Sequence, residues 1–285
     1  MFRLKSKKSS VILIALLIIL ALNGCSGGTE KSFSGNKPEI IKKEKWTEIG
    51  KDMFVFTSAF YLANMTIIVS GNEAVLIDTG MDKKDSETLQ GFLKDRNLKL
   101  TNILITHMHG DHAANLSMLK TNDITPITPE NAKDKQKIKF RDKTLQILFT
   151  EGHYMSKGHI SVEVVEDHIL IAGDIICNNI IPPIAAGGSI KDLLKTLDQL
   201  KKEKYALIIP GHGEVVDTDL MFDRQFEYLN NAKAAVEKVI AAKGSIGDLH
   251  KIKLEDCIKD TSYLFKEMLD YWHTQSLRVI YTELL

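Results

Sequence analysis

Short apolar runs separated by polar loops recur along the chain from residue 46 onward, which is the pattern of a sheet-containing domain. Each run is four to seven residues long and contains β-branched or aromatic residues, so it favours a strand. Strands are predicted at Met53–Thr57, Met65–Val69, Ala74–Ile77, Leu100–Ile105, Ile124–Ile127, Lys143–Phe149, Ile160–Val165, His168–Ala172 and Tyr205–Ile209.

Apolar residues spaced three and four apart predict helices between and after these strands. Leu193, Leu197 and Leu200, for example, share one face of a single predicted helix. Helices are predicted at Asp82–Leu93, Ala113–Leu119, Asp192–Lys202, Met221–Ala242, Lys253–Asp256 and Tyr263–Glu283. The alternation of strands and helices indicates one α/β sandwich over residues 46–218, with a helical extension, residues 219–285, packed on it.

Residues 1–24 have the pattern of a targeting segment. A basic start precedes Val11–Leu22, an unbroken run of twelve apolar residues that is short for a membrane span and fits a signal peptide. The sequence Leu22-Asn23-Gly24-Cys25 resembles the bacterial lipobox, which implies cleavage before Cys25 and a lipid on its thiol. An ordinary signal peptide or an uncleaved anchor is the alternative.

Residues 25–45 are rich in glycine and serine, which predicts a flexible tether. Together with the lipid anchor at Cys25, this tether implies an extracytoplasmic protein held on the bacterial cell membrane. Without residues 1–24, the chain has 33 basic against 37 acidic residues and no concentrated basic patch, so nucleic acid is not an expected partner. Cys177 and Cys257 form no CxxC motif, and their spacing leaves open whether they pair.

The stretch Thr106–His112 carries the densest candidate chemistry. Three histidines and one aspartate follow directly on an apolar run, and imidazole nitrogens and carboxylate oxygens are the ligands of zinc-like ions. One ion cannot easily take four such side chains, so the cluster indicates two metal ions that share it. The four candidate ligands are His107, His109, Asp111 and His112.

Three further segments repeat this arrangement, because each follows an apolar run and carries a potential metal ligand. They contribute His153, Asp174 and His212. Asp78 follows the run that ends at Ile77 in the same way. Active sites commonly collect on loops at strand ends, so we expect these residues at one site.

Taken in order, these motifs resemble those of the metallo-β-lactamase superfamily. The sequence His107-Met108-His109-Gly110-Asp111-His112 is similar to the HxHxDH motif of that family. Four shorter motifs recur in the family's order, namely Leu76–Gly80, Gly152-His153, Ala172-Gly173-Asp174 and Pro210–Gly213. The resemblance covers roughly residues 50–215. It implies a four-layer αββα sandwich of the metallo-β-lactamase type, with a helical tail at its C-terminus.

The resemblance also implies a role for each residue. His107, His109 and His153 would hold a first metal ion, Asp111, His112 and His212 a second, and Asp174 would bridge the two. Asp111 would also be catalytic, because it would orient a metal-bridging hydroxide that attacks the substrate. Asp78 and His159 would orient ligands without binding metal themselves.

The activity implied by the resemblance is that of a dinuclear hydrolase acting on a small-molecule ester, thioester, lactone or amide. The expected cofactors are two divalent metal ions, zinc first, with iron or manganese as alternatives. Asp174 argues against a β-lactamase, since the true zinc β-lactamases resemble one another in having Cys or Ser there. A β-lactamase, an iron-dependent persulfide dioxygenase and a non-catalytic metal-binding lipoprotein remain the alternatives. The C-terminal extension is expected to cover the outer edge of the site.

Overall fold

The computed structural model describes residues 45–155, 157–216, 218–259 and 266–285. The described residues all belong to one compact unit. The predicted signal peptide, most of the predicted tether and the lipidation site Cys25 lie outside the described residues and stay predictions. Within the described residues, no helix is long and apolar enough to cross a membrane.

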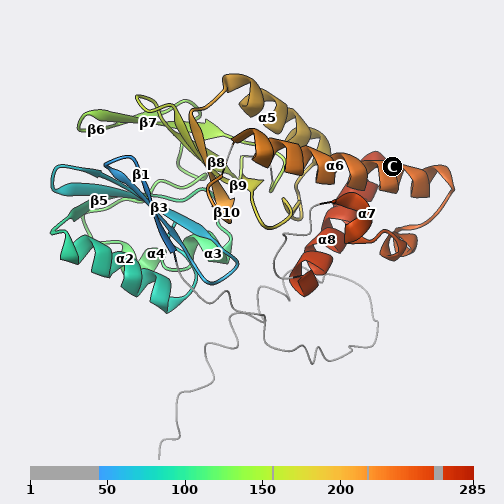
Figure 1. The fold of residues 1–285 in the computed structure, drawn as a ribbon, viewed down its shortest axis with the longest axis horizontal. Helices are drawn as coiled ribbons and strands as arrows, with labels where there is room; N and C mark the ends of the chain where they lie inside the picture. Colours follow the sequence, from blue (N-terminus) through green and yellow to red (C-terminus); the bar gives the residue numbers. More distant parts are fainter. Residues whose placement is uncertain (1–44, 156, 217, 260–265) are drawn as a thin grey trace, which may run out of the picture. The chain divides into compact units, whose positions relative to one another are not determined.

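Two five-stranded sheets form the centre of the unit (Figure 1). The first has the order β1-β2-β3-β4-β5, with only β4 and β5 parallel, and is built from β1 (Lys45–Ile49), β2 (Met53–Thr57), β3 (Asn64–Ser70), β4 (Glu73–Ile77) and β5 (Lys99–Leu104). The second has the order β10-β9-β8-β7-β6, with only β9 and β10 parallel, and is built from β6 (Lys137–Phe140), β7 (Lys143–Phe149), β8 (Ile160–Val164), β9 (Ile169–Cys177) and β10 (Leu207–His212).

Helices cover the outer face of each sheet. Figure 1 shows α2 on one side of the pair of sheets and α5 and α6 on the other, which makes four layers in the order αββα. The predicted fold class is therefore confirmed. The helices are α2 (Lys83–Asp95), α3 (Gly110–Ala113), α4 (Leu116–Leu119), α5 (Ile190–Glu203), α6 (Thr218–Ala241), the 3-10 helix η1 (Ile246–Lys251), α7 (Leu254–Cys257) and α8 (Lys266–Leu284).

The core between the sheets is aliphatic. Val75 and Leu104 of the first sheet share one buried cluster with Ile147, Val162 and Ile209 of the second, and all five side chains are fully buried. Each such side chain removed from water contributes about 1.5–3 kcal/mol to folding. This apolar interior holds the two sheets face to face, so the strand ends of both sheets come together at one edge.

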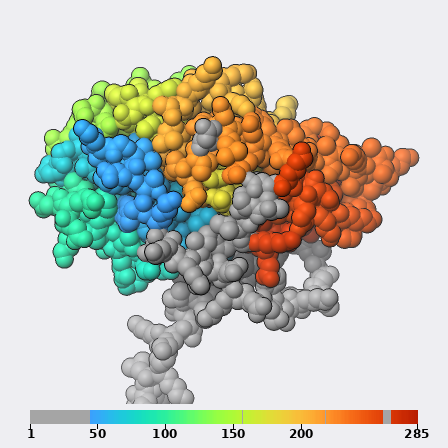
Figure 2. All heavy atoms as spheres, viewed as in Figure 1, coloured from blue at the N-terminus to red at the C-terminus, as the bar shows by residue number. Residues whose placement is uncertain are grey.

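The C-terminal extension packs on the second sheet rather than forming a separate body. Helix α6 contacts β9 and α5, and α8 packs against both α6 and α5. Figure 2 shows the surfaces of α6, in orange, and α8, in red, adjoining each other. Inside this layer Tyr228 Oη lies 3.1 Å from His273 Nδ1. Cys177 and Cys257 are both buried and free, so no disulfide joins them.

Two predicted elements are wrong. The predicted helix Ala113–Leu119 is two short helices, because Asn115 leaves helical geometry and donates from its side-chain amide to the carbonyls of Thr79 and Asp82. The predicted strand Ile124–Ile127 is irregular, and only its last residue forms a bridge, with Leu104. Pro126 explains this second case, since proline has no N–H to give to a sheet.

Candidate metal centre

The candidate ligands come from the C-terminal ends of strands in both sheets. His107 and His109 follow β5, His153 follows β7, and His212 is the last residue of β10. The sequence suggested that Asp174 lies in a loop after a strand. In the structure it lies within β9. Two bridges join the sheets here, His107 with His159 and Ala63 with His212. The site is therefore built where the two sheets meet.

The first group of ligands consists of His107, His109, His153 and one oxygen of Asp174. His107 Nε2 lies 3.0 Å from His109 Nδ1. Asp174 Oδ2 lies 3.6 Å from Nε2 of both His107 and His153. Four donor atoms thus converge on one point.

The second group consists of Asp111, His112 and His212, with the other oxygen of Asp174. Asp174 Oδ1 lies 3.0 Å from His112 Nε2 and 3.2 Å from His212 Nε2. Asp111 Oδ2 lies 3.4 Å from His212 Nε2 and 3.9 Å from His112 Nε2. All seven residues predicted as ligands come together, and Asp174 faces both groups.

A hydrogen bond at the far ring nitrogen orients three of these histidines. Nδ1 of His112 lies 2.8 Å from Asp78 Oδ2, and Nδ1 of His153 and His212 lie 2.7 Å from the carbonyl oxygens of Pro183 and Tyr61. Such contacts place the proton on Nδ1, because carbonyl and carboxylate oxygens can accept a hydrogen bond but cannot donate one. In the neutral ring this leaves Nε2 with a free lone pair, as a metal ligand requires.

Asp78 holds the start of the cluster as well as His112. Its two carboxylate oxygens accept from the backbone N–H and the hydroxyl of Thr106, both at 2.8 Å. Asp78 has a φ of +63°, in the left-handed region that Asp and Asn tolerate better than most residues. The predicted orienting role of Asp78 has this geometric basis.

His159 lies behind the first group and not in it. Its Nε2 accepts from the backbone N–H of Asp174 at 3.1 Å, and its Nδ1 lies 2.7 Å from Thr150 Oγ1. Its ring stacks on that of His107, with 5.1 Å between centroids. Gly173 makes room for this contact, because a Cβ there would lie 2.6 Å from His159 Nε2. His159 thus contacts both Asp174 and His107 from behind the first group.

Sequence reasoning missed the groups that orient His153 and His212. Pro183 and Tyr61 act through backbone carbonyls, which no residue type reveals. It also missed Asn64, whose buried amide donates to the carbonyls of Pro210 and Gly213, on either side of His212. A buried asparagine at a strand start is the only signal that could have suggested it.

The first-group histidines are neutral in the metal-free protein. Burial lowers the pKa of His107 well below its usual value, and the nearby His112 adds to this effect. The pKa of His109 falls to about 4, first through burial and then through His153. Burial also lowers the pKa of His153. Their nitrogens can therefore accept a metal ion near pH 7 without first losing a proton.

The second group has the opposite electrostatics. Burial lowers the pKa of His112, but the carboxylates of Asp174, Asp111 and Asp78 outweigh burial and raise that pKa well above its usual value. Asp174 and Asp111 likewise raise the pKa of His212 against the effect of burial. Burial raises the pKa of Asp174, yet His212 and His112 lower it well below its usual value. The carboxylates thus favour the protonated form of both histidines in the metal-free protein, so a metal ion would compete with a proton for Nε2.

The residues present fit divalent metal ions. Ligands on one tetrahedral zinc ion at about 2.0–2.2 Å stand roughly 3.3 Å apart, close to the spacings within both groups. His153 Nε2 is buried without a hydrogen bond, although buried polar atoms normally have one. Five imidazoles and two carboxylates are a donor set suited to zinc, iron or manganese.

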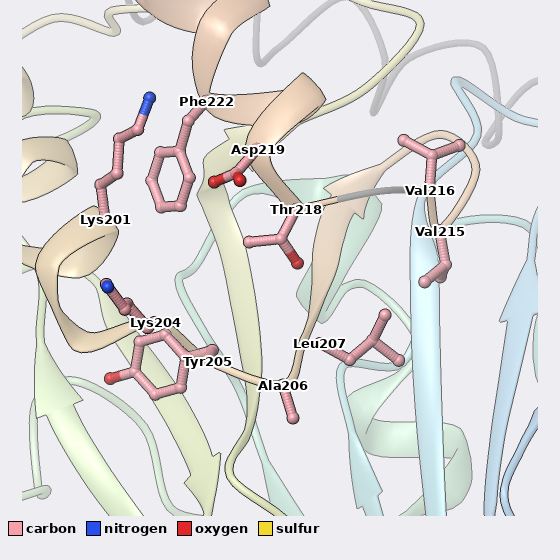
Figure 3. Close-up of a pocket in the computed structure, with 10 residues that line it drawn as sticks. All are labelled: Lys201, Lys204, Tyr205, Ala206, Leu207, Val215, Val216, Thr218, Asp219 and Phe222. Atoms are coloured by element: carbon pink, nitrogen blue, oxygen red, sulfur yellow. The ribbon is translucent and has the colours of Figure 1, made fainter.

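Three histidines stay outside the site. His168 contacts Glu163, His250 lies in η1, and His273 packs in the C-terminal layer. A hollow of about 610 Å³ lies elsewhere, between the end of α5 and the start of α6 (Figure 3). Lys201 and Phe222 line it, and no member of either ligand group does. The hollow is therefore not the metal centre.

Comparison with known proteins agrees with this geometry. A family model described as the metallo-beta-lactamase superfamily matches residues 59–147 and 139–212. The chain belongs to this superfamily. The matched region runs through every candidate ligand and ends at His212. Helices α6, α7 and α8 lie beyond it.

Named relatives include several thioesterases. An atrochrysone carboxyl ACP thioesterase of Claviceps purpurea is 25% identical over 259 residues, which cover 84% of this chain and 79% of that protein. Thioesterase pkgB of Emericella nidulans is 25% identical over 166 residues, which cover 54% of this chain and 46% of that protein. The chain spans about half the length of several curated relatives that it matches.

Solved structures share the fold. A metallo-beta-lactamase from Pontibacter korlensis matches with a TM-score of 0.58 and 18% identity, covering 66% of this chain and 100% of that one. The metallo-beta-lactamase IND-7 matches with a TM-score of 0.56 and 22% identity, covering 67% of this chain and 99% of that one. At this identity the likeness concerns the architecture alone.

Proposed function

We propose that the protein is a hydrolase that binds two divalent metal ions, zinc first, and cleaves a small ester or thioester. The observation that carries the proposal is the placement of Asp174. Its side chain is buried, and its two oxygens face two separate groups of ligands. A carboxylate in this position suits a pair of ions and has no packing role of its own. The superfamily membership and the relatives named as thioesterases support the reaction class.

Bound metal ions would polarise the substrate's oxygen and make a water acidic enough to attack near neutral pH. The chain's own residues would hold the reacting groups in place. The side chain of Asp111 is 20% exposed, whereas that of Asp174 is 3% exposed. Asp111 is thus the more exposed of these two carboxylates, and it could accept a proton from the attacking water on the substrate side. Asp78 keeps Nε2 of His112 free for metal through its contact with Nδ1.

Apolar side chains beside the first group favour an acyl substrate. Met108 stands between two ligands and is 48% exposed, and Met155 follows the ligand His153 and is 50% exposed. The ring of Tyr154 lies edge-on to that of His109, with 4.8 Å between centroids. Exposed methionine side chains adapt to irregular apolar ligands. This surrounding supports an ester or thioester with an apolar acyl group.

Elemental analysis of the purified protein, coupled to an activity screen, tests the proposal. We expect two zinc ions per chain and turnover of an acyl thioester or aryl ester, with weaker or no turnover of cephalosporins. His109→Ala and Asp174→Ala should each lower the metal content and abolish turnover. His250→Ala, at an exposed histidine outside the site, should do neither.

Three results would contradict the proposal. Two metals retained in the Asp174→Ala variant would remove Asp174 from the metal centre. One iron per chain, with sulfite formed from glutathione persulfide, would make the protein a dioxygenase. Two bound zinc ions without turnover of any ester, thioester, lactone or β-lactam would leave a metal-binding protein without hydrolase activity.

A further inference from the structure

The segment 183–189, which follows β9, holds the ligand His153 by three hydrogen bonds. Pro183 O lies 2.7 Å from His153 Nδ1. The N–H of Ala185 donates to the carbonyl of His153 at 2.8 Å, and the N–H of Ser189 donates to the carbonyl of Gly152 at 2.9 Å. The ring and both flanking peptides of this ligand therefore take their position from one segment.

The backbone around Gly152 and the backbone of segment 183–189 lie in close contact, with no room for an added side chain. A Cβ at Gly152 would lie 2.2 Å from the backbone N of Leu193, and a Cβ at Gly188 would lie 2.5 Å from Gly152 O. Gly188 thus joins the segment tightly to the peptides of Gly152 and His153, and Gly152 packs as closely on Leu193 of α5, the helix that follows the segment.

Helix α8 fixes this segment from its other side. The buried N–H of Ile184 donates to the hydroxyl of Ser276, itself fully buried, at 3.0 Å. Glu283 accepts from Ser189 Oγ at 2.8 Å, at the end of the segment, and from the N–H of Ile190, the first residue of α5, at 2.7 Å. The carboxylate of Glu283 thus sits at the N-terminus of α5, where the helix dipole favours a negative charge. Both contacts span more than 90 residues of sequence.

We propose that Ser276 and Glu283 are positioning residues for His153, so that the C-terminal helix completes the first half of the metal centre. The path is short: α8 holds segment 183–189, and that segment holds the ring and peptides of His153. Among the described contacts, no comparable path runs from α8 to the second group. There Asp78 orients His112, and the carbonyl of Tyr61 orients His212. The inference rests on the proposed metal centre, but not on the identity of the substrate.

The test uses the full-length chain in two backgrounds that each leave one ligand group intact. His212→Ala keeps the first group, and His153→Ala keeps the second. Zinc affinity is measured by chelator competition with and without the pair Ser276→Ala and Glu283→Ala. Removing a partner that directly orients a ligand weakens metal binding by about 10- to 100-fold. Ser276 and Glu283 act one contact further away, so we expect zinc affinity to fall about tenfold in the His212→Ala background. In the His153→Ala background we expect no change in zinc affinity.

Tyr281→Phe is the matched control, because it removes a hydrogen bond of the same helix, from Tyr281 Oη to Gly244 O, that does not touch segment 183–189. It should leave both affinities unchanged. Equal weakening in the two backgrounds, or none in the His212→Ala background, would overturn the inference.

Amide hydrogen exchange gives a readout that needs no metal. The N–H groups of Ala185 and Ser189 should exchange faster in the Ser276→Ala, Glu283→Ala pair than in the Tyr281→Phe control. Unchanged exchange would overturn the inference. If no variant binds zinc at all, the proposed metal centre fails, and the exchange rates still decide whether α8 positions the His153 loop.

Discussion

Asp78 offers the sharpest test of how this centre is oriented. It is 2% exposed and accepts three contacts of 2.8 Å, from the N–H and hydroxyl of Thr106 and from His112 Nδ1. Asp78→Asn keeps the shape and tolerates the left-handed backbone, but its amide presents a donor where one of the accepting oxygens stood. If the oxygen stays on Thr106 N–H, the NH₂ group faces His112 Nδ1.

The consequence falls on the second ligand group. To avoid opposing donors, His112 would move its proton from Nδ1 to Nε2, and a protonated Nε2 cannot bind metal. We expect zinc binding at the second group to weaken about 10- to 100-fold, or about 1.4–2.7 kcal/mol, as for other residues that orient a ligand. Asp78→Ala should also destabilise the fold by about 2–6 kcal/mol, because the buried N–H of Thr106 and Nδ1 of His112 lose their partner at about 1–3 kcal/mol each. The hydroxyl of Thr106 keeps a second partner, since it lies 3.1 Å from His107 Nδ1.

Chelator competition on the protein with one and two zinc ions measures the affinity, and urea unfolding of the metal-free protein measures the stability. Asp142→Asn is the control, since it changes an exposed carboxylate that contacts only Ser70 among the hydrogen bonds described. Unchanged affinity for both zinc ions in Asp78→Asn would refute the claim that this carboxylate sets the tautomer of His112.

Two further predictions concern stability. The metal-free protein should be most stable near pH 6.5. The pKa values of His107, His109 and His153 are lowered by folding, so stability is lost as the pH falls from 6.5 toward 4. The pKa values of His112 and His212 are raised by folding, so stability is lost as the pH rises above 6.5. Urea unfolding across this range checks the sign, and a steady rise to pH 9 would contradict it. Asn64→Ala should cost about 2–4 kcal/mol, because the carbonyls of Pro210 and Gly213 lose their buried donor. It should also weaken the zinc ion held by His212, and an unchanged affinity would show that Asn64 serves the fold alone.

Much of the fold could be predicted from the sequence where burial decides the residue type. The strands Met53–Thr57 and Lys143–Phe149 were predicted with the observed bounds, and most others differ at their ends by one to three residues. The strands β1 and β6 were missed for a physical reason. Both lie at the outer edge of their sheets and are largely exposed, so their sequences are polar and resemble loops.

The candidate ligands could be identified from the sequence because their chemistry is carried by side chains at short spacing. What orients them could not, since it depends on backbone carbonyls and on contacts between distant segments. Pro183, Tyr61 and Ser276 are ordinary residues in the sequence. They matter only because the fold brings Ser276 to Ile184 and Tyr61 to His212.

The division of the cluster into two halves follows from one local change of backbone. His109 is extended, with φ of −66° and ψ of 151°, and precedes the first turn of α3. His107 and His109 thus leave β5 on extended chain and point to the first group, whereas Asp111 and His112 lie on a helical turn that directs them to the second. The sequence predicts two ions from the number of ligands. The structure adds the cause, because a strand end followed at once by a helix can aim neighbouring side chains at two points that a single carboxylate, Asp174, can join.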